Sequence, residues 1–215
     1  MFFGIVDLTT YILGTIFIIL IPGPNSIYVM TTSSRQGVHA GIASAAGVFV
    51  GDSILMLLAS LGAAAVLHTL PSVFLGIQVV GAIYLMWLGY GLLTQAKLNW
   101  TSRHQAYDAP KVTIDKRHPF KRALLISLVN PKAILFFVSF FVQFVSPEYE
   151  YPWLSFLILA IILQVFSVAY LATLIWGGVS LANLFARRRG LSAIGNALVG
   201  IAFISFGLKM LVEIY

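Results

Sequence analysis

Long stretches without a charged residue constrain this chain more than any other feature. The four longest have 27, 44, 36 and 19 residues and cover residues 8–34, 53–96, 151–186 and 190–208. A helix needs about 20 apolar residues to cross the hydrocarbon of a bilayer. The 44-residue run is long enough for two such helices and contains a turn signal, Leu70-Pro71-Ser72. The sequence therefore predicts a chain that crosses a membrane several times.

Composition excludes a soluble globule. Charged residues make up 9% of the chain, whereas a soluble domain carries about 25%. In lipid only helices and closed barrels satisfy the backbone, and these runs are continuously apolar rather than alternating. We expect an all-α membrane protein with a single transmembrane domain over residues 1–215. Its six expected helices cover residues 8–31, 39–67, 72–94, 121–145, 152–181 and 191–212.

Basic residues gather in three of the five expected connections. Eleven of the 13 Lys and Arg residues lie between helices one and two, three and four, or five and six. The positive-inside rule places these connections in the cytoplasm, so both termini are expected to face outward. The net charge of +6 is then a topology signal, and we expect lipid contacts but no nucleic-acid partner. No Lys or Arg precedes Arg35, so the first run is expected to remain as a helix and not to be a cleaved signal peptide.

The six expected helices divide into two groups of three. Gly76-Ile77-Gln78-Val79-Val80-Gly81 in the third resembles Gly195-Asn196-Ala197-Leu198-Val199-Gly200 in the sixth, and a helix interrupted by proline begins each group. With three helices per group, the second group enters the membrane from the opposite side. This predicts an inverted repeat, common in transporters, and chance agreement between glycine-rich helices is the alternative. Repeat A covers about 1–95, a basic loop about 95–120 and repeat B about 121–215.

The first helix is interrupted by Pro22, Gly23 and Pro24 after 14 apolar residues, about 20 Å from its start. A proline inside a helix removes a donor and costs about 3 kcal/mol, so an unwound segment is expected within the bilayer. A new half-helix then begins near Asn25 and Ser26, which suit an N-cap. Its free amides would attract a carboxylate. A kink that only packs against its neighbours is the alternative.

The fourth expected helix repeats this arrangement at Asn130, Pro131 and Lys132. Lys132 adds a full positive charge, which either contacts a ligand or extends to the cytoplasmic face. Other polar side chains inside the expected helices are interpreted as interhelical hydrogen-bonding groups. They are Gln78, Gln143, Gln164 and Tyr170.

Asp52 is the one acidic residue well inside an expected helix, about 14 residues from its start. An acid at this depth costs about 2.5–3.5 kcal/mol and usually serves as a proton relay, an ion ligand or half of an ion pair. Burial favours the neutral form of a carboxyl, so Asp52 is a candidate proton carrier. A structural pair with Lys132 is the alternative. The small residues Ala43, Gly47 and Gly51 allow close packing, so Asp52 should face protein.

Enzyme and cofactor motifs are missing from the sequence. It contains no P-loop, no dinucleotide-binding glycine motif and no H-E-x-x-H, so uphill transport would use an ion gradient. There is no cysteine, and the four histidines are too scattered to share a metal. We expect no metal, no cofactor and no enzymatic activity. The histidines are His39, His68, His104 and His118.

Three motifs together give the chain a family resemblance. They are Ile21-Pro22-Gly23-Pro24-Asn25, Gly47-Val48-Phe49-Val50-Gly51-Asp52 and Asn130-Pro131-Lys132-Ala133. In order and spacing they resemble the lysine exporter (LysE)/RhtB superfamily of bacterial amino-acid exporters, and Ser127–Phe144 is most similar to the leucine-exporter branch. The resemblance implies a secondary exporter of leucine and related neutral amino acids in the bacterial inner membrane, driven by proton antiport. A passive channel, or export of homoserine, threonine or basic amino acids, is the alternative.

The residues and the resemblance together suggest how a zwitterion would bind. Asn25 and Ser26, with Lys132, would hold the carboxylate, and Asp52 would exchange a proton for the substrate ammonium. Glycine-lined helices permit a monomer or a homodimer. Candidates for an apolar wall around the substrate side chain are Phe49, Tyr84 and Phe136.

Overall fold

The computed structural model describes residues 3–20, 23–69, 71–101, 118–146, 148–187 and 189–214, and almost all of them are helical. This confirms the expected all-α membrane protein. The elements are α1 (Leu8–Leu20), α2 (Pro24–Gln36), α3 (Val38–Thr69), α4 (Pro71–Thr101), α5 (Pro119–Leu128), α6 (Pro131–Ser139), the 3-10 helix η1 (Phe141–Phe144), α7 (Pro152–Arg187) and α8 (Arg189–Ile214).

Two of the expected helices are broken, as the prolines predict. The chain bends by 50° between α1 and α2 and by 51° between α5 and α6. Each bent pair has the length and composition of one span, and α3, α4 and α7 each contain a full span. The sixth expected crossing corresponds to α8, in which the described apolar stretch, Asn196–Lys209, is shorter than a full span.

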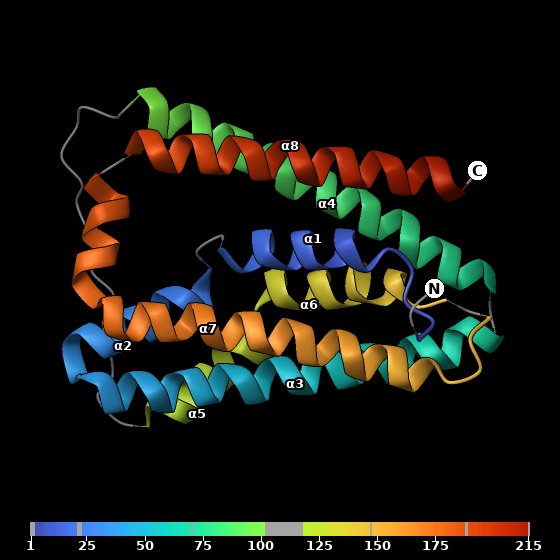
Figure 1. The fold of residues 1–215 in the computed structure, drawn as a ribbon, viewed down its shortest axis with the longest axis horizontal. Helices are drawn as coiled ribbons and strands as arrows, with labels where there is room; N and C mark the ends of the chain where they lie inside the picture. Colours follow the sequence, from blue (N-terminus) through green and yellow to red (C-terminus); the bar gives the residue numbers. More distant parts are fainter. Residues whose placement is uncertain are drawn as a thin grey trace.

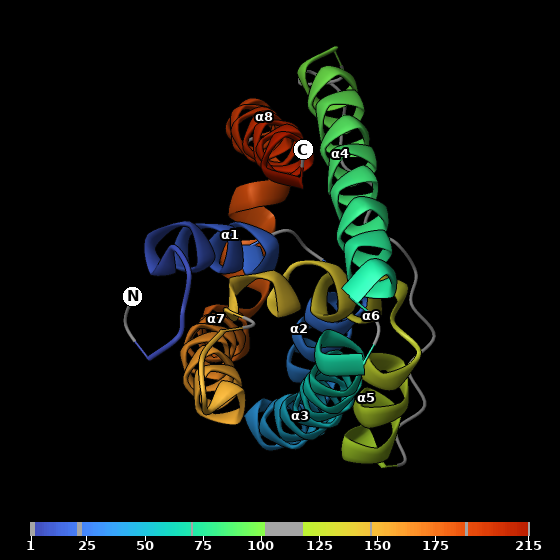
Figure 2. The ribbon, with the colours of Figure 1, turned by 90° about the vertical axis from the view of Figure 1, so that its right-hand side faces the viewer.

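The two halves of the chain run in opposite directions. In Figure 1 the pair α1–α2 leads away from the end that holds both termini, and the pair α5–α6 leads back toward it. Each bent pair is followed by two long helices, and α4 packs chiefly along α8 (Figures 1 and 2). This is the arrangement that an inverted repeat produces.

Basic residues lie at the end of the molecule opposite the termini, which we call the basic end. Here α2 and α4 finish and α5 begins (Figure 1). The described basic residues at this end are Arg35, Lys97, Lys121, Arg122, Arg187 and Arg189. Five more lie outside the described residues: Arg103, Lys111, Lys116, Arg117 and Arg188.

Several expected boundaries are wrong by up to seven residues. The third expected helix continues past residue 94 to Thr101, and Arg35 lies in the last turn of α2 rather than in a loop. Gly37 alone connects α2 to α3, with φ of 89°. This left-handed backbone suits glycine because it has no Cβ, and it lets one helix follow another directly.

Aromatic side chains fill the core between the middle of the molecule and the end that holds the termini. Phe136, Phe140 and Phe144 recur every four residues, with ring centroids 4.9 and 4.8 Å apart, and we call them the aromatic column. All three are at most 4% exposed. Tyr11 of α1 packs on this column, and its hydroxyl donates to the Leu159 carbonyl at 2.8 Å.

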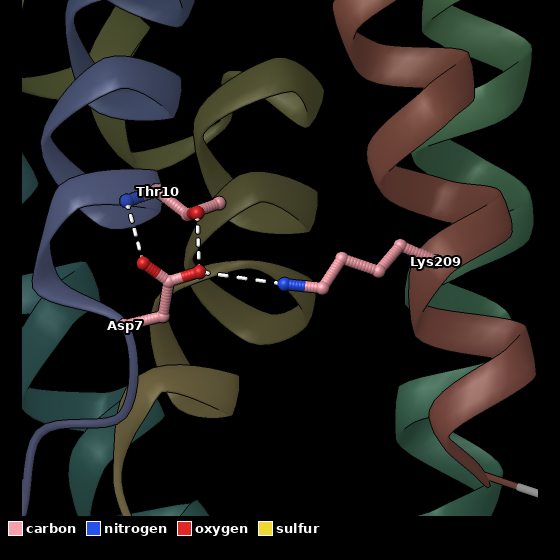
Figure 3. A network of polar contacts seen from close by, with 3 residues as sticks. All are labelled: Asp7, Thr10 and Lys209. Atoms are coloured by element: carbon pink, nitrogen blue, oxygen red, sulfur yellow. Dashed lines mark hydrogen bonds and ion pairs between the residues drawn. The ribbon is translucent and has the colours of Figure 1, made fainter.

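Asp7 holds the start of α1 in place (Figure 3). Its carboxylate accepts from the Thr10 amide at 3.1 Å and from the Thr10 hydroxyl, and it lies 3.4 Å from the Lys209 ammonium of α8. The hydrogen bonds from Thr10, followed by Lys209, hold the pKa of Asp7 below its ordinary value. The contact fastens the first half-helix to the last helix.

Candidate functional site

Two hollows in the molecule differ in chemistry. The larger, about 1150 Å³, is formed by α3 and α7 and lined almost entirely by apolar side chains such as Leu57 and Trp153. The smaller, about 80 Å³, lies where the two helix breaks meet α3 and α7, and we call it the central cavity. Of these two, only the central cavity has many polar side chains in its lining, as a site for a small ion would need. They belong to Asn25, Ser26, Asp52, Asn130, Lys132, Ser167 and Tyr170.

Asp52 faces protein, as the ridge of small residues predicts. Its side chain lines the central cavity, the residue is 8% exposed, and the Ser127 hydroxyl donates to its Oδ1 at 2.6 Å. The close approach depends on glycine, because a Cβ on Gly51 would lie 2.6 Å from the Ser127 Cβ. A Cβ on Gly47 would likewise lie 2.9 Å from that of Ala123. The sequence predicted this acid but not its hydrogen-bond partner.

Lys132 points toward the first helix break, so its expected alternative at the cytoplasmic face is wrong. Its Nζ donates to the carbonyl of Ile18 at 2.8 Å. That carbonyl lies in the last turn of α1, where backbone oxygens lack helical partners and a cation is favoured. The lysine stem passes Gly23, where a Cβ would lie 3.5 Å from Lys132 Cδ. One side chain thus links the break between α5 and α6 to the break between α1 and α2.

Two groups that can carry opposite charges share the lining of the central cavity. They are the carboxyl of Asp52 and the amine of Lys132. Each also has its own hydrogen bond, to Ile18 and to Ser127 respectively. The cavity can therefore present an anionic and a cationic group to one small molecule.

The half-helices that follow the two breaks begin differently. At α6, Asn130 is the N-cap, and its Oδ1 accepts from the Lys132 amide at 3.1 Å. At α2 the N-cap is Gly23, without a side-chain cap bond, so the expectation that Asn25 and Ser26 cap this helix is wrong. The reason is Pro24, whose fixed φ suits the first helical position. Among the described residues, the buried Oδ1 of Asn25 has no hydrogen-bond partner.

The prolines shape the breaks without lining the cavity. Pro24 and Pro131 stand in the first turns of α2 and α6, and neither contributes to the cavity wall. Pro22 lies outside the described residues. Of the other predicted site residues, Gly23 and Asn130 do line the cavity.

The remaining polar candidates have separate roles. Gln164 donates to the Phe49 carbonyl at 3.0 Å and to the Ser53 hydroxyl at 2.8 Å, which confirms an interhelical hydrogen bond. Tyr170 instead lines the cavity, within hydrogen-bonding reach of Ser26. Gln143 lies in η1, and the side chain of Gln78 is outside what the structure describes.

Of the three aromatic candidates for an apolar wall, only Phe136 is confirmed as part of the cavity lining. Phe49 lines the larger groove, and Tyr84 stacks on Trp87 at 5.8 Å. Sequence reasoning missed Ser167. Helical spacing on α7 could have indicated that Ser167 faces the cavity. The residues on this face that line the cavity are Leu163, Ser167, Tyr170 and Leu171.

The chain is similar to known proteins over nearly its whole length. The model of the LysE type translocator family matches residues 16–214. An uncharacterised membrane protein of Pseudomonas aeruginosa is 50% identical over 209 residues, 96% of this chain and 95% of its own. Leucine efflux proteins of Enterobacter sp. and Klebsiella pneumoniae are 40% and 41% identical over 208 residues, 97% of this chain and 96% of theirs. No solved structure matches.

Proposed function

Because the chain belongs to the LysE type translocator family, we propose that it exports leucine and related neutral amino acids across the bacterial inner membrane. Translocators move solutes and are not enzymes, and the chain is a multi-pass membrane protein. Relatives named leucine efflux proteins share about 40% of their residues with it over 97% of its length. That similarity is the support for the choice of leucine.

The observation that carries the proposal is the pairing of Asp52 with Lys132 in one cavity at both helix breaks. An amino acid is a zwitterion, so it needs one group of each sign within a few ångströms. Intramembrane charges are costly and usually mark a transport or proton pathway. Discontinuous helices that meet within the bilayer are the usual frame for such a site.

The binding mode follows from the uncapped start of α2. The substrate carboxylate would accept from the first amides of α2, from Ser26 and from Lys132, since a helix N-terminus favours an anion. The ammonium would donate to Asp52 and to the unpartnered Oδ1 of Asn25. An aliphatic side chain would pack on the apolar part of the lining: Val48, Phe136, Phe137, Leu163 and Leu171.

The central cavity is small, at about 80 Å³. Export requires a binding site to open to each side of the membrane in turn. We expect a half-helix to move in that step. The breaks at α1–α2 and α5–α6 are suited to such motion, because the chain bends by 50° and 51° there and the run of helical hydrogen bonds is interrupted.

Proton antiport would use Asp52. As a carboxylate it would hold the substrate ammonium, and a proton arriving from outside would neutralise it and release the amino acid outward. The Ser127 hydroxyl, which now donates to Asp52, can equally accept from the protonated form. In this proposal the basic end faces the cytoplasm and both termini face the periplasm.

The test is efflux of a panel of labelled amino acids from membrane vesicles that contain the protein, with and without a pH gradient. The proposal expects leucine export that falls when the gradient is collapsed, with little export of lysine or threonine. A passive channel would instead give flux that follows the leucine gradient alone. Export of basic amino acids or threonine in preference to leucine would contradict the assigned cargo.

A further inference from the structure

One face of α2 carries polar groups along its whole length. Asn25, Tyr28, Thr32 and Gln36 are three or four residues apart, so they share one face of the helix, and we call them the polar stripe. Nine of the 13 residues of α2 are polar or charged, Tyr28 included, which is unusual for half of a membrane span. The stripe is about 16 Å long at 1.5 Å per residue.

Each residue of the polar stripe has a polar atom that is buried but not hydrogen-bonded within the described part of the chain. The atoms are Asn25 Oδ1, Tyr28 Oη, Thr32 Oγ1 and Gln36 Nε2. Burying a polar group without a partner is unfavourable, and four such groups in a row on one helix face need an explanation. Their spacing means that one continuous polar ligand or column of water would satisfy all four.

The stripe connects two places that matter for transport. Asn25 lines the central cavity, and Gln36 is the last residue of α2, next to Arg35 at the basic end. In the other direction the cavity meets the aromatic column, since Phe136 belongs to both. Polar groups therefore lie between the cavity and the basic end, and closely packed aromatic rings lie between the cavity and the end that holds the termini.

We propose that the polar stripe of α2 is the cytoplasmic half of the translocation route, along which water and the amino acid pass between the basic end and the central cavity. The aromatic column closes the other half of the route in this structure. The inference rests on the proposed transport function and orientation, and it assigns a path that those proposals leave open. Thr32 is fully buried midway along the stripe, so its exposure to solvent tests the route most directly.

The chain has no cysteine, so single cysteines can be placed without background. Thr32→Cys and Gln36→Cys probe the stripe, and Thr31→Cys is the matched control. Thr31 lies beside Thr32 but on another face, and its hydroxyl donates to the Ile27 carbonyl of its own helix. Inverted membrane vesicles, which expose the cytoplasmic face, are treated with a charged, membrane-impermeant methanethiosulfonate. The stripe cysteines should react at least about tenfold faster than the control, since only a solvated thiol forms thiolate readily.

Two further results sharpen the test. Leucine should slow modification of the Thr32→Cys variant. The Thr32→Val variant should export about five- to tenfold more slowly, because it loses one hydrogen bond to the water or amino acid that passes along the stripe. The Thr31→Val variant should export normally. Modification of the stripe cysteines no faster than of the control, in variants that still export, would overturn the proposed route.

This outcome is separable from failure of the proposed function. Thiol reactivity needs no knowledge of the cargo, so fast modification without leucine export would refute the cargo and support the route. Lys97→Cys, at the exposed end of α4, reports the orientation. If this cysteine reacts only in right-side-out vesicles, the basic end faces outward and the proposed orientation is wrong. Stripe cysteines that also react only in right-side-out vesicles would still support a path from the basic end to the cavity.

Discussion

Helices α2 and α6 are built by the same device and differ in almost every side chain. Each follows a bend of about 50°, each has proline in its first turn, and each contributes to the central cavity. Yet α2 has the polar stripe and an uncapped start, whereas α6 is capped by Asn130 and continues into the aromatic column. In the proposed inverted repeat these two half-helices are equivalent, and we propose that their side chains decide which one receives a ligand and which one packs.

Lys132 connects the two helix breaks. It belongs to α6, but its ammonium binds a carbonyl at the end of α1. The cation therefore satisfies the backbone that the first break exposes, and it simultaneously lines the cavity beside the start of α2. Movement of either half-helix would change this contact, so we expect the two breaks to move together.

The largest effect is expected at Asp52, which neither half-helix supplies. Asp52→Asn keeps the shape but removes the carboxylate, so leucine export should fall about 10- to 100-fold, the value of a hydrogen bond to a charged group. The remaining flux should no longer depend on the pH gradient. Ser127→Ala, which removes only the hydroxyl donor, should have a smaller effect. A properly inserted Asp52→Asn protein with normal rate and coupling would remove Asp52 from the mechanism.

A pair of glycines measures how tightly the two sides of the molecule are packed. A Cβ on Gly14 would lie within 2.8 Å of a ring carbon of Phe140, which is held between two other rings. A Cβ on Gly23 would meet Lys132 at an ordinary 3.5 Å. Gly14→Ala should therefore lower the free energy of unfolding by about 1–3 kcal/mol, and Gly23→Ala should change it little. Thermal unfolding in detergent measures the stability of both variants. Equal losses of stability in the two variants would contradict the difference in packing between these sites.

Two asparagines test the difference between the helix starts. Asn130→Ala removes a cap bond and should cost about 1 kcal/mol of stability. Asn25→Ala removes a buried oxygen that has no partner in the described residues, so stability should be maintained while the apparent affinity for leucine falls. Unfolding midpoints and the concentration dependence of export separate these effects. If both variants lose stability and neither loses affinity, α2 does not bind the substrate.

The smallest effect is expected at the start of α1, where Asp7 makes the cap that α2 lacks. Asp7→Asn keeps the cap geometry and removes the charge near Lys209, so at pH 7 it should cost below about 1 kcal/mol. Because the folded-state pKa of Asp7 is lowered, its contribution is present above the unfolded pKa of about 3.9. It is lost as the pH falls through the lower folded value. The unfolding midpoints of the unaltered protein and the Asp7→Asn variant should therefore converge as the pH falls below about 3.9. A difference between the midpoints that widens there would contradict the lowered pKa of Asp7.

Local chemistry explains what could be predicted from the sequence. A proline inside an apolar run breaks a helix wherever the run folds, so both bends were predictable. An acid within a span is costly enough to require protein around it, and Asp52 is indeed buried. Neither conclusion depends on which helices become neighbours.

The remaining details depend on three-dimensional neighbours. Ser127 becomes the partner of Asp52 only because α5 packs on the glycines of α3. Phe49 and Phe136 look alike in the sequence, but only Phe136 faces the central cavity. The start of α2 was misplaced because the preference of proline for the first helical position outweighed the capping preference of Asn25.

The central claim is that the cavity recognises both charges of an amino acid. Competition against labelled leucine export by two analogues tests it directly: 3-methylbutylamine, which lacks the carboxylate, and 4-methylpentanoate, which lacks the ammonium. Unlabelled leucine should compete, and each analogue should compete at least about tenfold less well, because each leaves one buried charge of the cavity unpaired. Competition by either analogue as strong as that of leucine would contradict a site built around Asp52 and Lys132.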